Sequence, residues 1–326
     1  MTPDILCLRP EADFQRVGAM APLSLTVSYR TPSDADVPHL MQQARALVIP
    51  AVGPKLPNTL FEKSSVKFVQ VTGAGLDRLD LQFLKEQGIR VANVPGGSNE
   101  AVAEYVVTTA SLLLRRFAWA DREIRKGHYR EFRARMIADS LLGLDGLTIG
   151  IVGFGVIGVA VANVFHKRGC SILFYDPAPR DPQAAVSLGA KGCSLGELLQ
   201  NSDVVSLHVP LLPQTTSLLG AKELALMKPG AVLVQASRGG VVNEKALAEI
   251  LRSGHLGGVA VDVYSAEPPE ADHPLFQLEG EAAERILFTP HIAGVSRQAT
   301  AFLFRASWRN IERVLLRNEA PQDAVI

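Results

Sequence analysis

The sequence is poor in cysteine, has no excess of charge of either sign and contains no long uninterrupted apolar run. Its three cysteines, Cys7, Cys170 and Cys193, are odd in number and form no CxxC pair. They argue against a disulfide framework or a zinc site and favour reduced thiols. The 33 basic residues balance the 33 acidic residues, so nothing favours nucleic acid or an anionic membrane surface as a partner. No resident metal is expected.

Targeting and membrane-spanning signals are also missing. The N-terminal segment lacks a basic stretch followed by a long apolar one, so it does not resemble a signal peptide. The most apolar helical stretch, residues 101–114, is interrupted by Glu104 and by hydroxyl residues, and it is too short to span a bilayer. These absences favour a cytoplasmic protein.

Short β-branched runs alternate with helical patterns in two successive blocks. The expected strands are residues 5–8, 25–29, 46–49, 67–71 and 89–94 in the first block and residues 147–152, 171–175, 204–208, 231–236, 257–263 and 285–289 in the second. This alternation predicts parallel sheets with crossover helices, and 326 residues suffice for two such α/β domains. Longer helices are expected at 99–117, 119–127 and 296–317, whereas the charged residues 128–146 fit no pattern.

The stretch GIVGFGVIG contains a glycine pattern that is typical of dinucleotide-binding loops. Gly153, Gly155 and Gly158 form GxGxxG between an apolar strand and a helical run, and the next strand ends at Asp176, about twenty residues further on. Such glycines permit a tight turn, close approach of a pyrophosphate and close helix packing, while the acid binds the ribose hydroxyls and repels a 2′-phosphate. The pattern favours NAD over NADP, although Arg180 lies close enough to complicate that preference. Packing alone is the competing explanation of the glycines.

Three polar residues follow later strands of the second block. Arg238 precedes a pair of glycines, Glu267 precedes a pair of prolines, and His291 lies in the stretch TPHIAG. Ligands of open parallel sheets bind beyond the carboxyl ends of the strands, so these side chains can converge on one cleft. A permanent cation, a group that titrates near neutrality and an adjacent carboxylate suit hydride transfer to a 2-oxo acid, which creates an alkoxide beside a carboxylate. Ordinary surface charges and a structural histidine are the competing explanations.

The motifs resemble those of the D-isomer-specific 2-hydroxyacid dehydrogenases over nearly the whole chain. In chain order they are VTGAGLDRLD (71–80), GSNEAVAEYVV (97–107), GIVGFGVIG (150–158), HVPLLPQT (208–215), ASRGGVVNE (236–244), DVYSAEPP (262–269) and TPHIAG (289–294). Seven motifs in the family's order are far more specific than any one of them.

The resemblance implies roles residue by residue. Arg238 would bind the substrate carboxylate and polarise the 2-oxo group, His291 would exchange a proton with the substrate oxygen, and Glu267 would hydrogen-bond His291. The substrate site would include Gly73, Ala74, Gly75 and Arg238, and NAD would be held by Gly153, Gly155, Val156, Ile157, Gly158, Asp176, Val209, Pro210, Ala236, Ser237 and Asp262. His208 would shape the cofactor loop rather than take part in the chemistry.

One stretch departs from the family pattern. Many relatives carry a tryptophan after the long helix, whereas residues 127–143 contain none and hold three arginines. In the family this region helps to form the dimer, so Arg133 or Arg135 is a candidate for the substrate pocket of the neighbouring subunit. Solvated helix charges are the equal alternative.

The implied fold is α/β, with two Rossmann-like or flavodoxin-like parallel-sheet domains and a cleft between them. The substrate domain would be discontinuous, residues 1–98 plus 294–326, and residues 99–293 would bind NAD. The implied activity is NAD-dependent interconversion of a D-2-hydroxy acid and a 2-oxo acid by a homodimer. The substrate side chain is left open, with residues 50–53 as candidates to line its pocket. The alternatives are an NAD(H)-sensing protein similar to the C-terminal-binding-protein corepressors and a related dehydrogenase that acts on formate or phosphite.

Overall fold

The computed structural model describes residues 2–178 and 182–326. The chain divides into two compact units, one made of Met1–Ser98 and Val295–Ile326 and the other of Asn99–Gly294. Arg180, considered above for its effect on cofactor choice, lies outside the described residues. Each unit is built around its own parallel sheet, so the α/β class expected from the sequence is confirmed.

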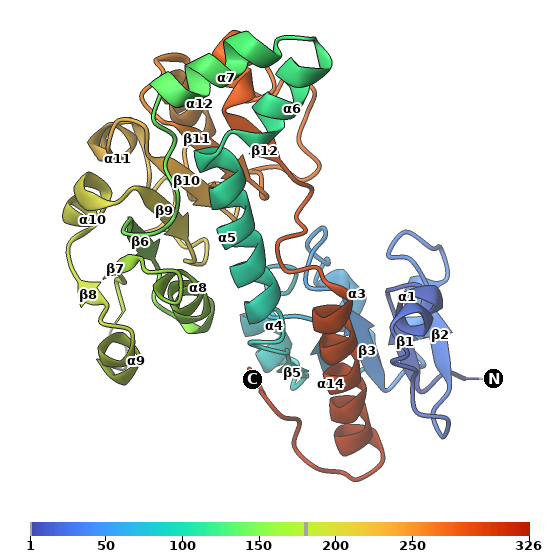
Figure 1. Cartoon of the computed structure of the whole chain (residues 1–326). Coiled ribbons are helices and arrows are strands. Elements are labelled where there is room, and N and C mark those ends of the chain that lie inside the picture. Colours follow the sequence, from blue (N-terminus) through green and yellow to red (C-terminus); the bar gives the residue numbers. More distant parts are fainter. Residues whose placement is uncertain (1, 179–181) are drawn as a thin grey trace. The chain divides into compact units, whose positions relative to one another are not determined.

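The first unit is a five-stranded parallel sheet with helices on both faces (Figure 1). Its strands are β1 (Ile5–Cys7), β2 (Val27–Tyr29), β3 (Ala46–Ile49), β4 (Phe68–Val71) and β5 (Arg90–Ala92), in the order β2-β1-β3-β4-β5. Its helices are α1 (Glu11–Arg16), α2 (Val37–Met41), α3 (Thr59–Glu62), α4 (Leu81–Glu86) and α14 (Arg297–Leu315). Buried side chains of α2, α3 and α4 pack on one face of the sheet, and those of α1 and α14 pack on the other. The strand order is that of flavodoxin-like sheets.

The second unit is a seven-stranded parallel sheet in the order β12-β11-β10-β9-β6-β7-β8. Its strands are β6 (Thr148–Val152), β7 (Ser171–Tyr175), β8 (Lys191–Gly192), β9 (Val204–Leu207), β10 (Val232–Gln235), β11 (Gly258–Val261) and β12 (Ile286–Phe288). Its helices are α5 (Asn99–Leu114), α6 (Phe117–Arg125), α7 (Tyr129–Ala138), α8 (Val156–His166), α9 (Pro182–Ser187), α10 (Leu195–Asn201), α11 (Ala221–Leu226), α12 (Glu244–Arg252) and α13 (Gly280–Glu284). Side chains of α5 and α8 pack on one face, and those of α10, α11 and α12 pack on the other. The strand order reverses between β6 and β9, which is where open sheets of this kind bind ligands.

The strands expected from the β-branched runs are all present, although most are shorter than expected. Strands β3, β4, β9, β10 and β11 are buried throughout, because helices cover both faces of each sheet, and such strands read as apolar runs. The long helix expected at 99–117 ends at Leu114, and a second helix begins at Phe117. Arg116 between them has a φ of 52°, a left-handed conformation that a continuous helix cannot contain. Within residues 2–178 and 182–326, no helix combines the length and the apolar character needed to cross a membrane.

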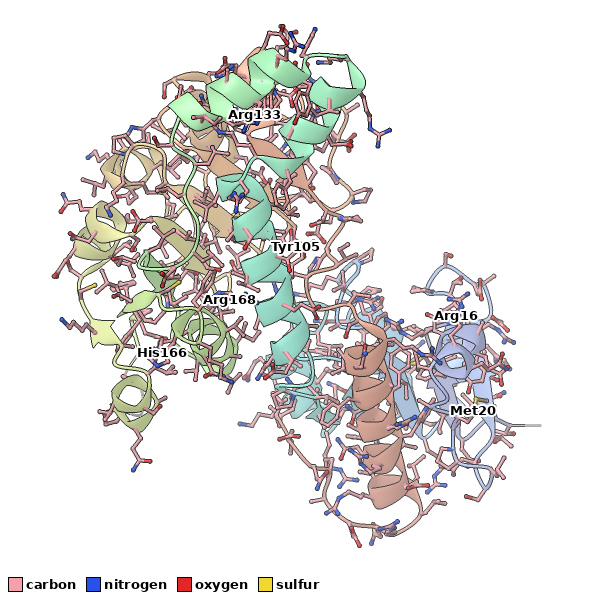
Figure 2. The ribbon with its side chains drawn as sticks, in the orientation of Figure 1. Arg16, Met20, Tyr105, Arg133, His166 and Arg168 are labelled. Carbon is pink, nitrogen blue, oxygen red and sulfur yellow. The ribbon has the colours of Figure 1, made fainter. Side chains whose placement is uncertain are left out.

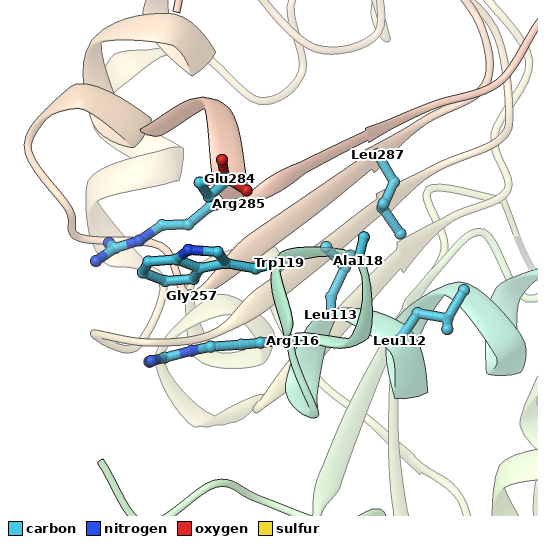
Figure 3. Close-up of a pocket in the computed structure, with 9 residues that line it drawn as sticks. All are labelled: Leu112, Leu113, Arg116, Ala118, Trp119, Gly257, Glu284, Arg285 and Leu287. Carbon is cyan, nitrogen blue, oxygen red and sulfur yellow. The ribbon is translucent and has the colours of Figure 1, made fainter. Parts of the chain in front are cut away.

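Helices α6 and α7 fold against each other around Trp119, which is 5% exposed. The ring of Phe132 on α7 meets the indole edge-on, with 5.4 Å between the centroids. Figure 3 shows the indole between the side chains of Arg116 and Arg285, beside a cavity of about 10 Å³. A cavity of that size holds at most a water molecule. The packing around Trp119 therefore joins α6 and α7 and leaves no room for a larger ligand.

The side chain of Arg135, on α7, contacts two residues of its own chain. Its guanidinium lies 4.6 Å from the centroid of Trp119, and its Nη1 lies 2.9 Å from Oε1 of Glu281. Arg133, by contrast, is exposed on α7 (Figure 2). The hypothesis that an arginine of this helix reaches a neighbouring subunit therefore rests on Arg133, and it stays a prediction.

Candidate active site

The loop between β6 and α8 has a backbone that excludes side chains at two positions. Gly153 has a φ of 95°, and a Cβ there would lie 2.6 Å from the carbonyl oxygen of His208. A Cβ on Gly158 would lie 2.0 Å from the carbonyl oxygen of Gly153, so a side chain would push α8 away from the loop. Gly155 is the N-cap of α8 and offers no side-chain acceptor to the amides of the first turn. This cradle, at the point where the strand order reverses, fits the pyrophosphate of a dinucleotide.

Asp176 follows β7 and is tied to the same loop. Its carboxylate accepts hydrogen bonds from the amide of Phe154 at 2.7 Å and from the amide of Ala178 at 2.9 Å. These bonds hold the acid beside the glycine cradle, where a ribose attached to the pyrophosphate would lie. Asp176 therefore lies beside the glycine loop, and its contact with the ribose stays a prediction.

The other residues expected to line the cofactor differ in exposure. Val156, in the first turn of α8, is 65% exposed. Val209 and Ser237 are buried, Ile157 and Ala236 are partly buried, and Pro210 is exposed. Nε2 of His208 lies 2.8 Å from Oγ of Ser206, and burial lowers the pKa of His208 to about 3. The His208 ring therefore stays neutral near pH 7, which suits a part in shaping the loop rather than in proton transfer.

His291 and Glu267 meet beyond the carboxyl ends of the neighbouring strands β12 and β11. Nδ1 of His291 lies 2.8 Å from Oε2 of Glu267, and Oε1 of Glu267 accepts a hydrogen bond from the amide of Tyr264 at 3.1 Å. The two side chains are 25% and 29% exposed, so a small molecule can reach them. Because the carboxylate favours a proton on Nδ1, Nε2 is left as the atom that can release or accept a proton.

The turn that carries His291 is fixed by Asp262. His291 has a φ of 55°, an uncommon left-handed conformation, and its amide donates to the carbonyl of Asp262 at 2.8 Å. The Asp262 carboxylate is fully buried and accepts hydrogen bonds from Oγ1 of Thr289 and from the amides of Ile292 and Ala293. Asp262 thus shapes this turn, and the contact with the nicotinamide that the resemblance implies for it stays a prediction.

Arg238 follows β10, the strand next to β11, and its loop packs against the segment that follows β11. A Cβ on Gly239 would lie 1.8 Å from the carbonyl oxygen of Tyr264, so the two segments touch only because residue 239 has no side chain. Nε2 of Gln235 donates to the carbonyl of Arg238, and Nη1 of Arg238 donates to the carbonyl of Ser237, both at 2.8 Å. The cation, the acid and the histidine therefore follow three adjacent strands of one sheet.

The Gly-Ala-Gly loop belongs to the first unit and follows β4. A Cβ on Gly73 would lie 2.9 Å from Cβ of Ala51, so this loop packs closely on the loop that follows β3. That second loop is held by Arg78, which is 2% exposed and donates to the carbonyls of Pro50 and Pro54 at 3.1 and 2.9 Å. Binding of a carboxylate by the amides of residues 73–75 stays a prediction.

Sequence reasoning missed several residues that shape these loops. Gln235 is 3% exposed and supports both Ser237 and Arg238. A polar residue at the end of the apolar strand VLVQ was the available signal. The hydroxyl of Tyr105 lies 2.7 Å from Oγ1 of Thr289 and links α5 (Figure 2) to the His291 turn. No local pattern marks that contact, because 184 residues separate its partners.

A glycine cradle at the reversal point of a parallel sheet, with a cation, an acid and a histidine at strand ends, is typical of dehydrogenases that bind a dinucleotide. The family model for the D-isomer specific 2-hydroxyacid dehydrogenase, NAD binding domain, matches residues 107–293. The chain belongs to the D-isomer-specific 2-hydroxyacid dehydrogenase family. The resemblance drawn from the sequence motifs is thereby confirmed.

Individual relatives agree in family and differ in length. The glyoxylate reductase of Thermococcus litoralis is 32% identical over 304 residues, which cover 92% of this chain and 89% of that protein. The D-3-phosphoglycerate dehydrogenase of Archaeoglobus fulgidus is 34% identical over 235 residues, 72% of this chain but only 42% of that longer protein. Among solved structures, the TT0316 protein from Thermus thermophilus has a TM-score of 0.82 and 30% identity, and 99% of each chain is covered.

Proposed function

We propose that this protein is an NAD-dependent D-2-hydroxyacid dehydrogenase that works reversibly as a 2-oxo acid reductase. The observation that carries the proposal is the contact of 2.8 Å between His291 and Glu267, one strand away from Arg238, in the sheet that holds the glycine cradle. Family membership supports the reaction class. We assign the binding of NAD and of the substrate carboxylate to the second unit, the latter to Arg238.

Bound NADH would supply the hydride for C2 of the 2-oxo acid. Arg238 pairs with the substrate carboxylate and stabilises the charge that develops on the 2-oxo oxygen. His291 donates a proton from Nε2 to that oxygen, so one hydride and one proton together convert the carbonyl to a hydroxyl. Glu267 keeps the ring oriented and stabilises its charged form. Oxidation uses the same groups in reverse.

Oxidation of NADH by the purified protein, measured against six 2-oxo acids, tests the proposal. The panel contains glyoxylate, hydroxypyruvate, pyruvate, phenylpyruvate, 2-oxoglutarate and phosphohydroxypyruvate. We expect kcat/KM of about 10⁴ M⁻¹s⁻¹ or more with glyoxylate or hydroxypyruvate. The glyoxylate reductase of Thermococcus litoralis is covered over 89% of its length by a match that takes in 92% of this chain, which supports a small 2-oxo acid as the substrate. Tight NADH binding without turnover of any acid would contradict the proposal and favour an NAD(H)-sensing protein.

Cofactor choice is expected to depend on the charge of Asp176. Asp176→Asn keeps an oxygen that can accept from the amide of Phe154 but removes the charge that repels a 2′-phosphate. We expect the ratio of kcat/KM for NADPH over NADH to rise by about 10-fold or more, since one removed like-charge contact near the surface is worth on the order of 1 kcal/mol or more. An unchanged ratio, measured with the best acid of the panel, would show that Asp176 does not face the ribose.

A further inference from the structure

The segment that carries Glu267 is anchored to α12 by a second carboxylate, that of Glu244. Oε1 of Glu244 accepts a hydrogen bond from the amide of Ser265 at 2.8 Å, and Oε2 accepts one from the hydroxyl of Ser265. Glu244 is the first residue of α12, and its side chain is 15% exposed. Both of its oxygens are thus committed to one serine in the segment between Asp262 and Glu267.

The carboxylate of Glu244 also contacts His273, which follows Glu267 in the chain. Its Nε2 lies 3.1 Å from Oε2 of Glu244, at ion-pair distance but without the alignment of a hydrogen bond. The residue is 8% exposed, and its ring meets that of Tyr264 edge-on at 5.8 Å. We call Glu244, Ser265 and His273 the Glu244 cluster. Glu244 thus contacts one residue that precedes Glu267 in the chain and one that follows it, and both contacts restrain the segment that carries Glu267.

The clamped segment is also the one on which the candidate active site depends. The amide of Tyr264 binds Oε1 of Glu267, whose other oxygen contacts His291. The carbonyl of Tyr264 is the atom against which Gly239 packs. The peptide between Tyr264 and Ser265 thus contacts Gly239 through its carbonyl and Glu244 through its amide, and the amide of the preceding peptide binds Glu267.

We propose that Glu244 is a positioning residue for the reaction, holding Ser265 so that the neighbouring Tyr264 amide keeps the Glu267 carboxylate against His291. The expected effect on kcat rests on the proposed function. The expected restraint of Ser265 rests on the hydrogen-bond geometry alone. Without Glu244 the amide and hydroxyl of Ser265 turn to water, the segment gains freedom, and the orientation of His291 loosens. A displacement of about 1 Å at a reacting group can cost about 100-fold in rate.

Two variants of Glu244 and one matched control separate positioning from simple stability. Glu244→Ala removes both acceptors. Glu244→Gln keeps an oxygen for the Ser265 amide and an amide group that can donate to the Ser265 hydroxyl. Glu249→Ala removes an exposed carboxylate from the same helix.

We expect Glu244→Ala to lower kcat by about 10- to 100-fold, Glu244→Gln to recover most of that loss, and Glu249→Ala to match the wild type. The Kd for NADH, measured by fluorescence, is expected to stay within about twofold in all three, because the glycine cradle lies on other strands.

Hydrogen exchange of the peptide 262–268 gives a readout that does not depend on any activity. The Ser265 amide, freed from Glu244, is expected to exchange about 10-fold faster in Glu244→Ala and at the wild-type rate in Glu249→Ala. Wild-type kcat in Glu244→Ala would overturn the positioning role even if exchange accelerates. If the wild type reduces none of the 2-oxo acids, the proposed function fails, and unchanged exchange would separately overturn the anchoring of Ser265.

Discussion

Removal of the His291 imidazole is expected to lower kcat/KM for a 2-oxo acid by about 10²- to 10⁴-fold, the range contributed by a positioned general acid. Two variants are needed, because His291 has a φ of 55°. Alanine strains that backbone, whereas asparagine tolerates the left-handed conformation and still cannot deliver a proton at neutral pH. We expect His291→Ala and His291→Asn to lose activity alike, while the Kd for NADH stays near that of the wild type.

The control for this experiment is His166→Ala. His166 ends α8 in the same unit and is exposed, so its replacement is expected to leave kcat/KM unchanged. Loss of activity in His291→Ala with full activity in His291→Asn would assign the effect to backbone strain. In that case another group would have to supply the proton.

The parts of the fold that could be predicted from the sequence are those whose signal is local. Strands such as β9 (VVSL) and β10 (VLVQ) are buried on both faces, so each reads as an apolar run between polar turns. The glycine loop could be predicted because both positions require glycine: a Cβ on Gly153 or Gly158 would lie 2.6 or 2.0 Å from a backbone oxygen. The contact between Glu267 and His291 was implied by the resemblance of their motifs to the family, and in the structure the two side chains lie 2.8 Å apart.

The parts that could not be predicted depend on residues far apart in the chain. Helix α7 has one buried residue, Phe132, and its further contacts include Trp119 and the ion pair of Arg135 with Glu281. Strand β8 has only two residues, both exposed, and it forms by pairing with β7. Asp262 fixes the His291 turn through hydrogen bonds to residues about 30 positions further along the chain. The periodicity of apolar residues does not predict such bonds.

Removal of the Arg238 guanidinium is expected to cost about 10²- to 10³-fold in kcat/KM, as loss of a donor to a developing oxyanion does. The loss should appear in KM as well as in kcat, because one group both binds the substrate carboxylate and stabilises the transition state. Arg238→Lys is expected to fall between the wild type and Arg238→Ala, because an ammonium keeps the charge but cannot form two parallel hydrogen bonds to a carboxylate. Arg252→Ala, an exposed arginine at the end of α12, is the matched control and should change neither constant.

Added guanidinium ion separates a chemical role of Arg238 from a structural one. Besides the bond from Nη1 of Arg238 to the Ser237 carbonyl, the loop of Arg238 is held by the bond from Nε2 of Gln235 to the Arg238 carbonyl and by the packing of Gly239 on Tyr264. Truncation of the side chain therefore leaves the loop in place and opens a space that a free guanidinium ion can enter. Partial recovery of kcat in Arg238→Ala at millimolar guanidinium, with no effect on Arg238→Lys, would support the role. If Arg238→Ala retains wild-type kcat/KM, the carboxylate must be bound elsewhere.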